Sequence, residues 1–242
     1  MSTRTVDWTA LRRREEEPAG EGLRERKKRQ LRQRLSDTAT EMFLERGFDA
    51  VRVAEIAEAC GVSEKTVFNH FPTKESLVLD LGASTLDSLR TVLPDPARSP
   101  VEAVLEILSA ELAALTSWLA AQEDPAEAKA ALLRFAALTR STPSLRAYHH
   151  DMTAQQVTVA AEILAHRTGT TPDAPEPRIA AAALLALWPL QFQSLHRHLN
   201  RTETPEQLYD EVTADVHRAA RLLDTGLRSL QEPPWSEPGA PG

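Results

Sequence analysis

Residues 52–77 read RVAEIAEACGVSEKTVFNHFPTKESL, and this stretch decides the fold. Its first part predicts a short helix, because four apolar residues recur with helical spacing: Val53, Ile56, Ala57 and Cys60. Gly61 ends that helix, since glycine adopts the left-handed conformation at little cost. Ser63 can cap a second helix with its hydroxyl. Pro72 ends the second helix, because the residue before a proline is pushed out of the helical region.

Two short helices joined by a tight turn that contains glycine form a helix-turn-helix. In that motif the second helix lies in the major groove of DNA, and its first residues reach the base edges. Here the second helix spans 64–71, and Val67, Phe68 and Phe71 are expected to pack inward. The exposed face is expected to carry Glu64, Lys65, Thr66, Asn69 and His70. Geometry alone leaves another interpretation open, an ordinary α-hairpin inside an all-α core.

The residue types favour the first interpretation. Ile56 to Leu77 resembles, position by position, the DNA-binding signature of the TetR family of bacterial transcriptional regulators, roughly I-A-x-x-x-G-V-S-x-x-T-[LVI]-[YF]-x-[HY]-F-x-x-K-x-x-L. The direct resemblance covers residues 24–77, and beyond them it is one of length and helical layout. It implies a repressor that binds a palindromic operator as a homodimer and is released by a small molecule.

Composition agrees with an all-α fold of two domains. The chain has 242 residues, of which 42% are hydrophobic, enough for a DNA-binding domain and a larger helical domain. Aromatic residues are only 5%, and alternating β-branched runs are absent. We expect about nine helices. The predicted parts are a disordered arm (1–22), a helix-turn-helix domain (23–73), an effector-binding and dimerisation domain (74–231) and a disordered tail (232–242).

Apolar periodicity and the positions of prolines predict where the other helices begin and end. Besides the two motif helices they are expected at about 24–46, 74–93, 101–122, 125–140, 143–168, 176–200 and 204–230. Thr73 can cap the helix that begins at residue 74. Pro189 should kink its helix, because proline provides no N–H for the carbonyl of Leu185. The resemblance implies that the last two helices, 176–200 and 204–230, form the homodimer interface.

The net charge of −7 is unevenly distributed. Residues 24–34 contain seven bases and one acid, so this segment is +6 and the rest of the chain sums to −13. Such asymmetry indicates a local nucleic-acid footprint on an acidic body. We expect Lys27, Lys28 and Arg29 to contact the phosphate backbone.

The resemblance also assigns DNA contacts. The matching positions are Ser63, Glu64, Lys65, Thr66, Phe68, Asn69, His70 and Lys74. Lys65 can donate to guanine and Asn69 can pair with adenine, whereas Thr66 and Lys74 are expected at phosphates. Two positions depart from the family pattern. Phe68 stands where Tyr is common and loses a hydroxyl, and Arg52 stands where Thr is usual and loses a cap while gaining reach towards a phosphate.

In the TetR family the effector binds among the helices of the C-terminal domain. The candidates implied here are Trp118, Phe135, Tyr148, Met152, Gln156 and Trp188. Each is also an ordinary core residue at helical spacing. Their mostly apolar character favours a hydrophobic or amphipathic ligand.

Other classes of protein are disfavoured. Cys60 is the only cysteine, which excludes an intramolecular disulfide and favours a plain core thiol. The polar N-terminus and the lack of an 18-residue apolar run predict a cytoplasmic bacterial protein, associated with the nucleoid when bound to DNA. His149 and His150 are adjacent and point about 100° apart on a helix, and no P-loop or Ser-His-Asp order is present. We therefore expect no catalysis, no cofactor and no metal. The alternative function is a helical ligand-binding or adaptor protein that does not read DNA, which the +6 segment disfavours.

Overall fold

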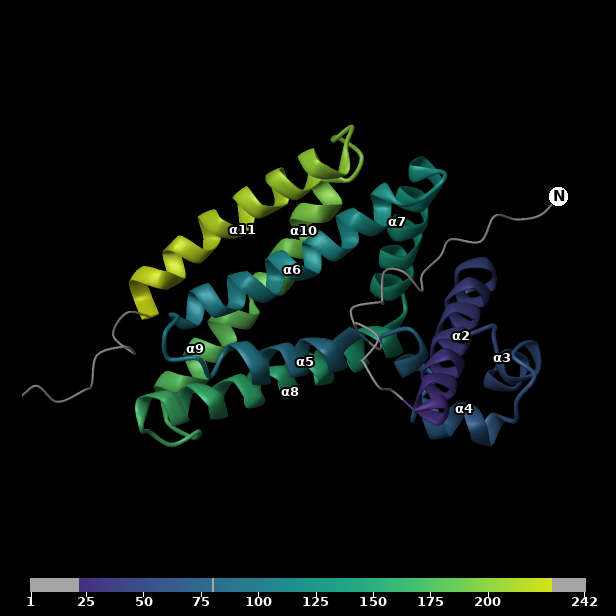
Figure 1. Cartoon of the computed structure of the whole chain (residues 1–242), viewed down its shortest axis with the longest axis horizontal. Helices are drawn as coiled ribbons and strands as arrows, with labels where there is room; N and C mark the ends of the chain where they lie inside the picture. The colour runs from purple at the N-terminus through teal and green to yellow at the C-terminus, as the bar shows by residue number, and fades with distance from the viewer. Residues whose placement is uncertain (1–21, 80, 228–242) are drawn as a thin grey trace, which may run out of the picture. The chain divides into compact units, whose positions relative to one another are not determined.

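The computed structural model describes residues 22–79 and 81–227, including their side chains except at 81–83, 226 and 227. Over this part of the chain the backbone forms ten α-helices and one 3-10 helix, with no strand (Figure 1). The all-α prediction is confirmed. The elements are α2 (Leu23–Arg46), α3 (Val53–Ala59), α4 (Glu64–His70), η1 (Glu75–Leu77), α5 (Leu81–Val92), α6 (Pro100–Ala120), α7 (Pro125–Ser141), α8 (Pro143–Thr168), α9 (Pro175–Leu185), α10 (Leu187–His198) and α11 (Pro205–Leu227).

The helices group into two compact units. Of the described residues, unit 1 contains 22–79, 81–82 and 114–151, and unit 2 contains 83–113 and 152–227. α6 and α8 therefore contribute to both units. The predicted domain boundaries remain a prediction. The predicted arm, apart from Gly22, and the predicted tail lie outside the described residues.

The helix-turn-helix of unit 1 forms as the sequence predicts. Gly61 has a φ of 67°, the left-handed conformation that ends the first motif helix. Ser63 then caps α4, because its Oγ accepts a hydrogen bond from the N–H of Thr66 at 3.2 Å. Gly47 follows the last residue of α2 with a φ of 86° and a ψ of 151°, an extended conformation with positive φ that is open to glycine.

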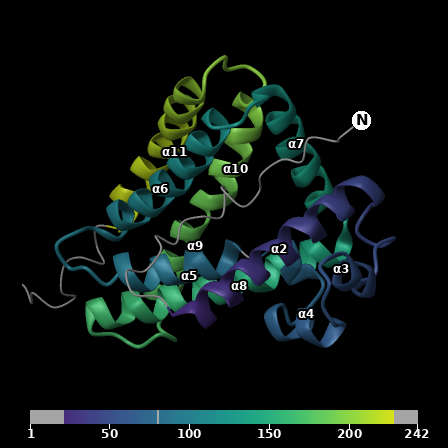
Figure 2. The same ribbon diagram turned by 45° about the vertical axis from the view of Figure 1, so that its right-hand side comes forward.

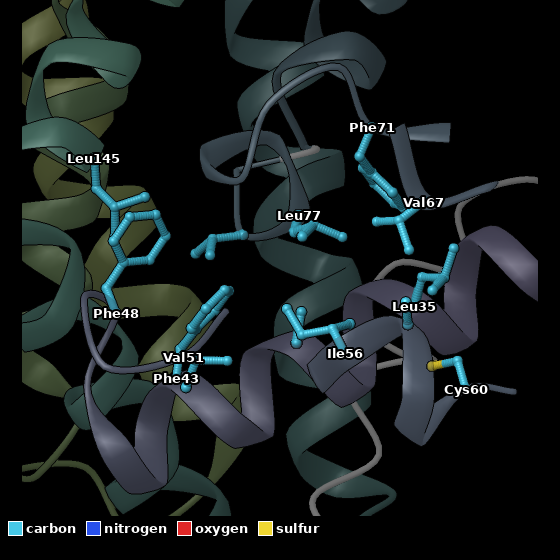
Figure 3. Packing of buried hydrophobic residues seen from close by; sticks show 13 residues of the cluster. Leu35, Phe43, Phe48, Val51, Ile56, Cys60, Val67, Phe71, Leu77 and Leu145 are labelled. Carbon is cyan, nitrogen blue, oxygen red and sulfur yellow. The ribbon is translucent and has the colours of Figure 1, made fainter. Parts of the chain in front are cut away.

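Large apolar side chains from several helices pack into the core of unit 1 (Figure 3). Those with no exposed surface include Leu35, Phe43, Val51, Ile56, Val67, Phe71, Leu77 and Leu145. The rings of Phe43 and Phe48 lie 4.9 Å apart between centroids. Cys60 is buried in the same core, so the thiol packs there as expected. The prediction that Phe68 packs inward is wrong, because 46% of its surface is exposed.

The single helix predicted at 74–93 is also wrong. The chain instead forms η1 and then starts α5 at Leu81. The N–H of Ser76 donates to Thr73 Oγ1 at 3.1 Å, so Thr73 caps this short turn. The carbonyl of Leu77 accepts a hydrogen bond from the buried hydroxyl of Ser36 at 2.7 Å. That bond occupies the carbonyl that a continuous helix would have paired with residue 81.

In unit 2 the helix predicted at 176–200 is broken in two. α9 ends at Leu185 and α10 begins at Leu187, so the single residue Ala186 is both the C-cap of α9 and the N-cap of α10. Pro189 lies in the first turn of α10, where its missing N–H costs nothing, so the expected kink takes the form of a break. α10 and α11 lie side by side (Figure 2).

A charged cluster joins these two helices. The carboxylate of Asp215 on α11 accepts hydrogen bonds from Ser194 Oγ at 2.7 Å and from Arg197 at 3.2 Å. His198 Nε2 lies 3.1 Å from the same carboxylate, and Arg218 donates to its other oxygen. Only 10% of the Asp215 side chain is exposed. These bonds lower the pKa of Asp215, with the Ser194 hydrogen bond the largest cause.

Two helical stretches are apolar and long enough to cross a membrane by length and composition, Pro100–Ala120 and Pro175–His198. The criterion is weak, because core helices of soluble proteins meet it as well. Such a stretch can contain one or two charged residues, whereas an unbroken apolar run contains none. In α6 the fully or almost fully buried residues include Val104, Leu108 and Leu112, as in a core helix.

Candidate nucleic-acid interface

α4 carries the predicted contact surface, and two buried residues set its rotation. Val67 and Phe71 have no exposed surface and anchor one side of the helix in the core. The other side exposes Glu64, Lys65, Phe68 and Asn69, while Thr66 and His70 are half-buried. The structure therefore brings the predicted base-reading residues together on one exposed face.

The start of α4 is held by two hydroxyl groups. Besides accepting the Thr66 N–H, Ser63 Oγ lies 2.9 Å from Thr66 Oγ1, and either atom can donate. A hydroxyl pair at the first turn can also bond a phosphate oxygen, since helix N-termini favour anions. The phosphate role of Thr66 remains a prediction.

The basic segment divides into exposed bases and bases that hold the domain together. Lys27 and Lys28 are exposed, and Lys28 Nζ lies 4.0 Å from Glu25. Arg29 is half-buried. Arg32 donates to the carbonyl of His70, and its guanidinium lies 4.3 Å from the centroid of the Phe71 ring.

Arg34 makes a second bond of this kind. Its Nη2 donates to the carbonyl of Cys60 at 3.1 Å. Arg32 and Arg34 thus tie α2 to the last turns of the two motif helices. Sequence analysis missed both roles, because an arginine that bonds a distant carbonyl has the same local sequence context as one that binds phosphate.

His70 ends α4 beside these bases. Partial burial lowers the pKa of His70, and the charges of Arg32 and Lys28 lower it further. The imidazole is therefore neutral at neutral pH and offers one donor and one acceptor. Such a group can bond a base edge but adds no charge to the interface.

Lys74 has a partner that the sequence does not reveal. Its Nζ donates to the carbonyl of Phe48 at 2.6 Å and lies 4.4 Å from the centroid of the Phe48 ring and 5.4 Å from that of Phe43. Burial is the main reason why the pKa of Lys74 is lowered. This ammonium group holds the loop after α2 in place. A contact between Lys74 and a phosphate would therefore compete with its contacts to Phe48.

Arg52 precedes α3 without capping it through its side chain. The carboxylate of Glu55 accepts from the N–H of Arg52 at 2.8 Å and from Arg46 at 2.8 Å. These bonds, the Arg46 hydrogen bond first, lower the pKa of Glu55 to about 2. The Arg52 side chain is 80% exposed, and its Nε lies 3.5 Å from Glu55. Half of a capping box therefore forms even though Arg52 supplies no acceptor.

The six candidate effector residues fall in both units. Trp118, Phe135 and Tyr148 belong to unit 1, whereas Met152, Gln156 and Trp188 belong to unit 2. Trp118 and Gln156 are buried and the other four are half-buried. Their ligand role remains a prediction.

One of them has a polar partner that sequence analysis missed. Trp188 Nε1 donates to Glu111 at 2.9 Å, and Thr85 donates to the other oxygen of that carboxylate at 3.1 Å. The signal available in the sequence was the position of Glu111, an acid within the largely apolar helix α6. A cavity of about 900 Å³ in unit 2, lined in part by Arg98, Arg167 and Asp224, contains none of the six candidates.

These features define the class of the protein, a helix-turn-helix protein whose second motif helix presents polar side chains. Comparison with known proteins gives the family. The model of the bacterial regulatory proteins of the tetR family matches residues 35–81, and that of the MftR C-terminal domain matches residues 105–231. The chain belongs to the TetR family and is a transcriptional regulator with a DNA-binding domain.

Relatives span almost the whole chain. The HTH-type transcriptional regulator TcmR of Streptomyces glaucescens is 27% identical over 92% of this chain and 94% of its own length. The putative mycofactocin biosynthesis transcriptional regulator MftR of Mycobacterium tuberculosis is 26% identical over 76% of this chain and 90% of its own length. The crystal structure of NalD, a secondary repressor of a multidrug efflux pump in Pseudomonas aeruginosa, is 22% identical over 79% of this chain and 97% of its own, with a TM-score of 0.48.

Proposed function

We propose that the protein is a ligand-responsive repressor that binds a palindromic operator as a homodimer. The observation that supports this most directly is the exposed face of α4, which is held in a fixed rotation by the buried residues Val67 and Phe71. Lys65 on that face can donate to guanine O6 and N7, and the Asn69 amide can donate to adenine N7 and accept from adenine N6. The protein acts in the cytoplasm, by binding rather than by catalysis, and is associated with the nucleoid when it holds DNA.

Selection of duplexes from a random DNA library with the full-length protein tests the proposal. A helix-turn-helix dimer should select two inverted half-sites about one helical turn apart. A gel shift on the DNA upstream of its own gene provides the natural sequence. If the protein selects no sequence and shifts no duplex, the alternative holds and the chain is a ligand-binding or adaptor protein.

Salt dependence tests the phosphate contacts. Replacing Lys27, Lys28 and Arg29 with glutamine should weaken binding about equally on all sequences. It should also flatten the salt slope by up to about one unit for each lost contact. The control replaces two exposed arginines outside α2 with glutamine, Arg146 in unit 1 and Arg178 in unit 2. A loss confined to the selected operator would contradict the phosphate role.

The homodimer should form through α10 and α11. Phe192 and Leu222 on these helices are 43% and 79% exposed in the single chain, as apolar interface residues would be. Leu222→Arg and Leu223→Arg should therefore sediment as monomer or aggregate. Leu23→Arg, at an equally exposed position of α2, should remain dimeric. An unchanged dimer in both α11 variants contradicts the assignment.

A hydrophobic or amphipathic small molecule should release the DNA. A ligand shifts an equilibrium only if it binds one state more tightly than the other. Acyl thioesters and lipophilic drugs, titrated into the protein, should change the fluorescence of Trp118 or Trp188 and lower operator affinity together. If a broad apolar library changes neither quantity, the effector proposal fails while the DNA-binding proposal stands.

A further inference from the structure

Unit 2 contains a cavity of about 900 Å³ that includes none of the six candidate effector residues. Its wall is formed by the loop between α5 and α6, the end of α8, the start of α9 and the last turn of α11. All of these segments belong to unit 2, so the shape of the cavity is set within one compact unit. Small-molecule sites in proteins measure roughly 300–1,000 Å³, and this cavity falls in that range.

Arg167, at the end of α8, is held in a fixed position in the wall of this cavity. Its Nη1 donates to the carbonyl of Leu93 at 2.6 Å, and its Nη2 donates to the carbonyl of Arg98 at 2.6 Å. Both acceptors are uncharged, so these bonds orient the guanidinium without neutralising it. Burial lowers the pKa of Arg167 more than the nearby charge of Asp95 raises it, yet a guanidinium stays protonated at neutral pH. A guanidinium has more N–H donors than these two bonds use, and the others can bond a carboxylate.

The same wall carries two carboxylates, Glu102 in the first turn of α6 and Asp224 in the last turn of α11. Hydrogen bonds from Ser99 hold the pKa of Glu102 below its usual value, and the nearby charge of Asp224 opposes this shift. The two carboxylates are therefore close enough to repel each other, and a cation beside them would be stabilised. The other arginine of the wall, Arg98, already has an acidic partner, because its Nη1 lies 2.8 Å from Glu106.

Proline rings contribute an apolar part of the wall. They belong to Pro94, Pro96, Pro100 and Pro177. A proline ring is apolar and fixes φ, so this part of the cavity is rigid and suits a hydrocarbon group.

We propose that this cavity binds a small zwitterion of the amino-acid type, a free amino acid or a short peptide with an apolar side chain. The ligand carboxylate bonds Arg167, the ligand ammonium lies beside Glu102 and Asp224, and the apolar side chain contacts the proline rings. A simple anion would meet the two acids, and a simple cation would leave Arg167 without a counter-ion. A ligand that carries both charges therefore suits this wall best. The site is separate from the proposed effector site and does not depend on DNA binding.

Isothermal titration calorimetry with the full-length protein at neutral pH tests the site. The probes are leucine, isoleucine, valine, methionine and phenylalanine, and the dipeptides made of two copies of each. At least one probe should bind, and the relative affinities of amino acids and dipeptides distinguish the two kinds of ligand. The tightest probe is then compared with two analogues, one without the amino group and one without the carboxylate. Each analogue should bind about 10- to 100-fold more weakly, because it loses one charge-assisted interaction.

Substitutions in the wall assign each charge of the ligand to its partner. The double variant Glu102→Gln/Asp224→Asn should bind the zwitterion about 10- to 100-fold more weakly and should bind the analogue without the amino group no more weakly than wild type does. Glutamine retains the cap of α6, since it can still accept the N–H of Ser99. The matched control, Asp210→Asn/Glu211→Gln, changes two exposed acids of α11 outside the cavity and should bind every probe as wild type does.

Arg167→Gln should have the complementary effect. It should weaken binding of the zwitterion and bind the analogue without the carboxylate no more weakly than wild type does. Because Arg167 also holds the loop between α5 and α6, circular dichroism accompanies this variant. If it does not fold, the double variant at residues 102 and 224 decides the question.

The outcomes are independent of the proposed function, because operator selection is carried out without amino acids. If none of the probes binds, or if both analogues bind as tightly as the zwitterion, the inference is overturned. If the double variant binds the zwitterion as tightly as wild type does, the ligand lies elsewhere and the inference is again overturned. In each of these cases the proposed repressor function stands or falls by its own tests.

Discussion

The helix-turn-helix and the α10–α11 pair are stabilised in different ways. The motif packs around large apolar side chains such as Phe43, Ile56 and Phe71, and its long-range polar bonds end on backbone carbonyls, which do not titrate. α10 and α11 also bury apolar residues, but they share the cluster around Asp215, in which one carboxylate meets four donors. The acceptors in the motif therefore keep their charge state at every pH, whereas the α10–α11 pair depends on the ionisation of one carboxylate.

Truncation of the motif core should have the largest effect. Phe43 has no exposed surface and contacts the Phe48 ring, so Phe43→Ala leaves a cavity. The expected loss is about 3–5 kcal/mol of unfolding free energy, or roughly 6–20 °C in the melting temperature. DNA binding should be lost with it. Leu23→Ala, which removes a 71% exposed side chain outside the proposed dimer interface, is the control and should change the melting temperature much less. A loss below about 1 kcal/mol in Phe43→Ala would show that this core can collapse around the cavity.

Removal of the Asp215 charge should come next and should depend on pH. Asp215→Asn leaves Arg197, His198 and Arg218 without their common carboxylate, at an expected cost of about 1–3 kcal/mol near neutral pH. The pKa of Asp215 is lowered from 3.8, so the folded state favours the ionised form. Its stabilisation is therefore fully present above the unfolded pKa and is lost as the pH falls through the folded pKa.

Thermal melts at several pH values measure this difference. The gap in melting temperature between wild type and Asp215→Asn should be widest near neutral pH and should shrink below about pH 4. The gap between wild type and Phe43→Ala should not shrink in this way, because no titrating group is removed. A pH-independent gap for Asp215→Asn would mean that the cluster acts through packing alone.

The parts of the fold that follow from neighbouring residues could be predicted from the sequence. The left-handed Gly61 and the Ser63 cap involve residues within a few positions of one another. The helical pattern of the motif also placed Val67 and Phe71 in the core. It misplaced Phe68, because α4 packs through the side that carries Val67, and residue 68 lies about 100° further round the helix, outside the buried side.

The parts that depend on distant residues could not be predicted. Next to the break after η1, the carbonyl of Leu77 accepts a hydrogen bond from the hydroxyl of Ser36, which lies 41 residues earlier in the chain. Arg32 bonds a carbonyl 38 residues away, and Arg34 and Lys74 each bond one 26 residues away. The count of seven bases in residues 24–34 therefore overstates the charge that is available to DNA, because at least two of them have internal carbonyl partners.

Removal of the α4 cap should have a smaller effect than either change above. Ser63→Ala loses the bond to the Thr66 N–H and should cost about 1 kcal/mol, or roughly 2–4 °C. Operator affinity should fall as well, since the first turn of α4 carries Lys65. Ser117→Ala, at an exposed position inside α6, is the control and should be neutral or slightly stabilising. Equal effects of the two changes would show that the cap contributes nothing.

The smallest effect is expected at the start of α3, where the motif departs from its family pattern. Arg52→Thr should supply the missing side-chain acceptor for the backbone N–H of Glu55, whose carboxylate already accepts the N–H of residue 52. The completed capping box should add up to about 1 kcal/mol, or roughly 2–4 °C in the melting temperature. The Arg52 side chain is 80% exposed, and its ion-pair partner in the described part of the chain is Glu55, so little internal packing is lost.

The same substitution tests whether Arg52 reaches a phosphate. If it does, Arg52→Thr should also make the salt dependence of operator binding shallower by about one contact per subunit. Stability and electrostatic affinity would then change in opposite directions at one residue. A more stable variant with an unchanged salt slope would show that the guanidinium only faces solvent and Glu55. A variant that is less stable would show that the Arg52–Glu55 ion pair contributes more to the start of α3 than a threonine cap can replace.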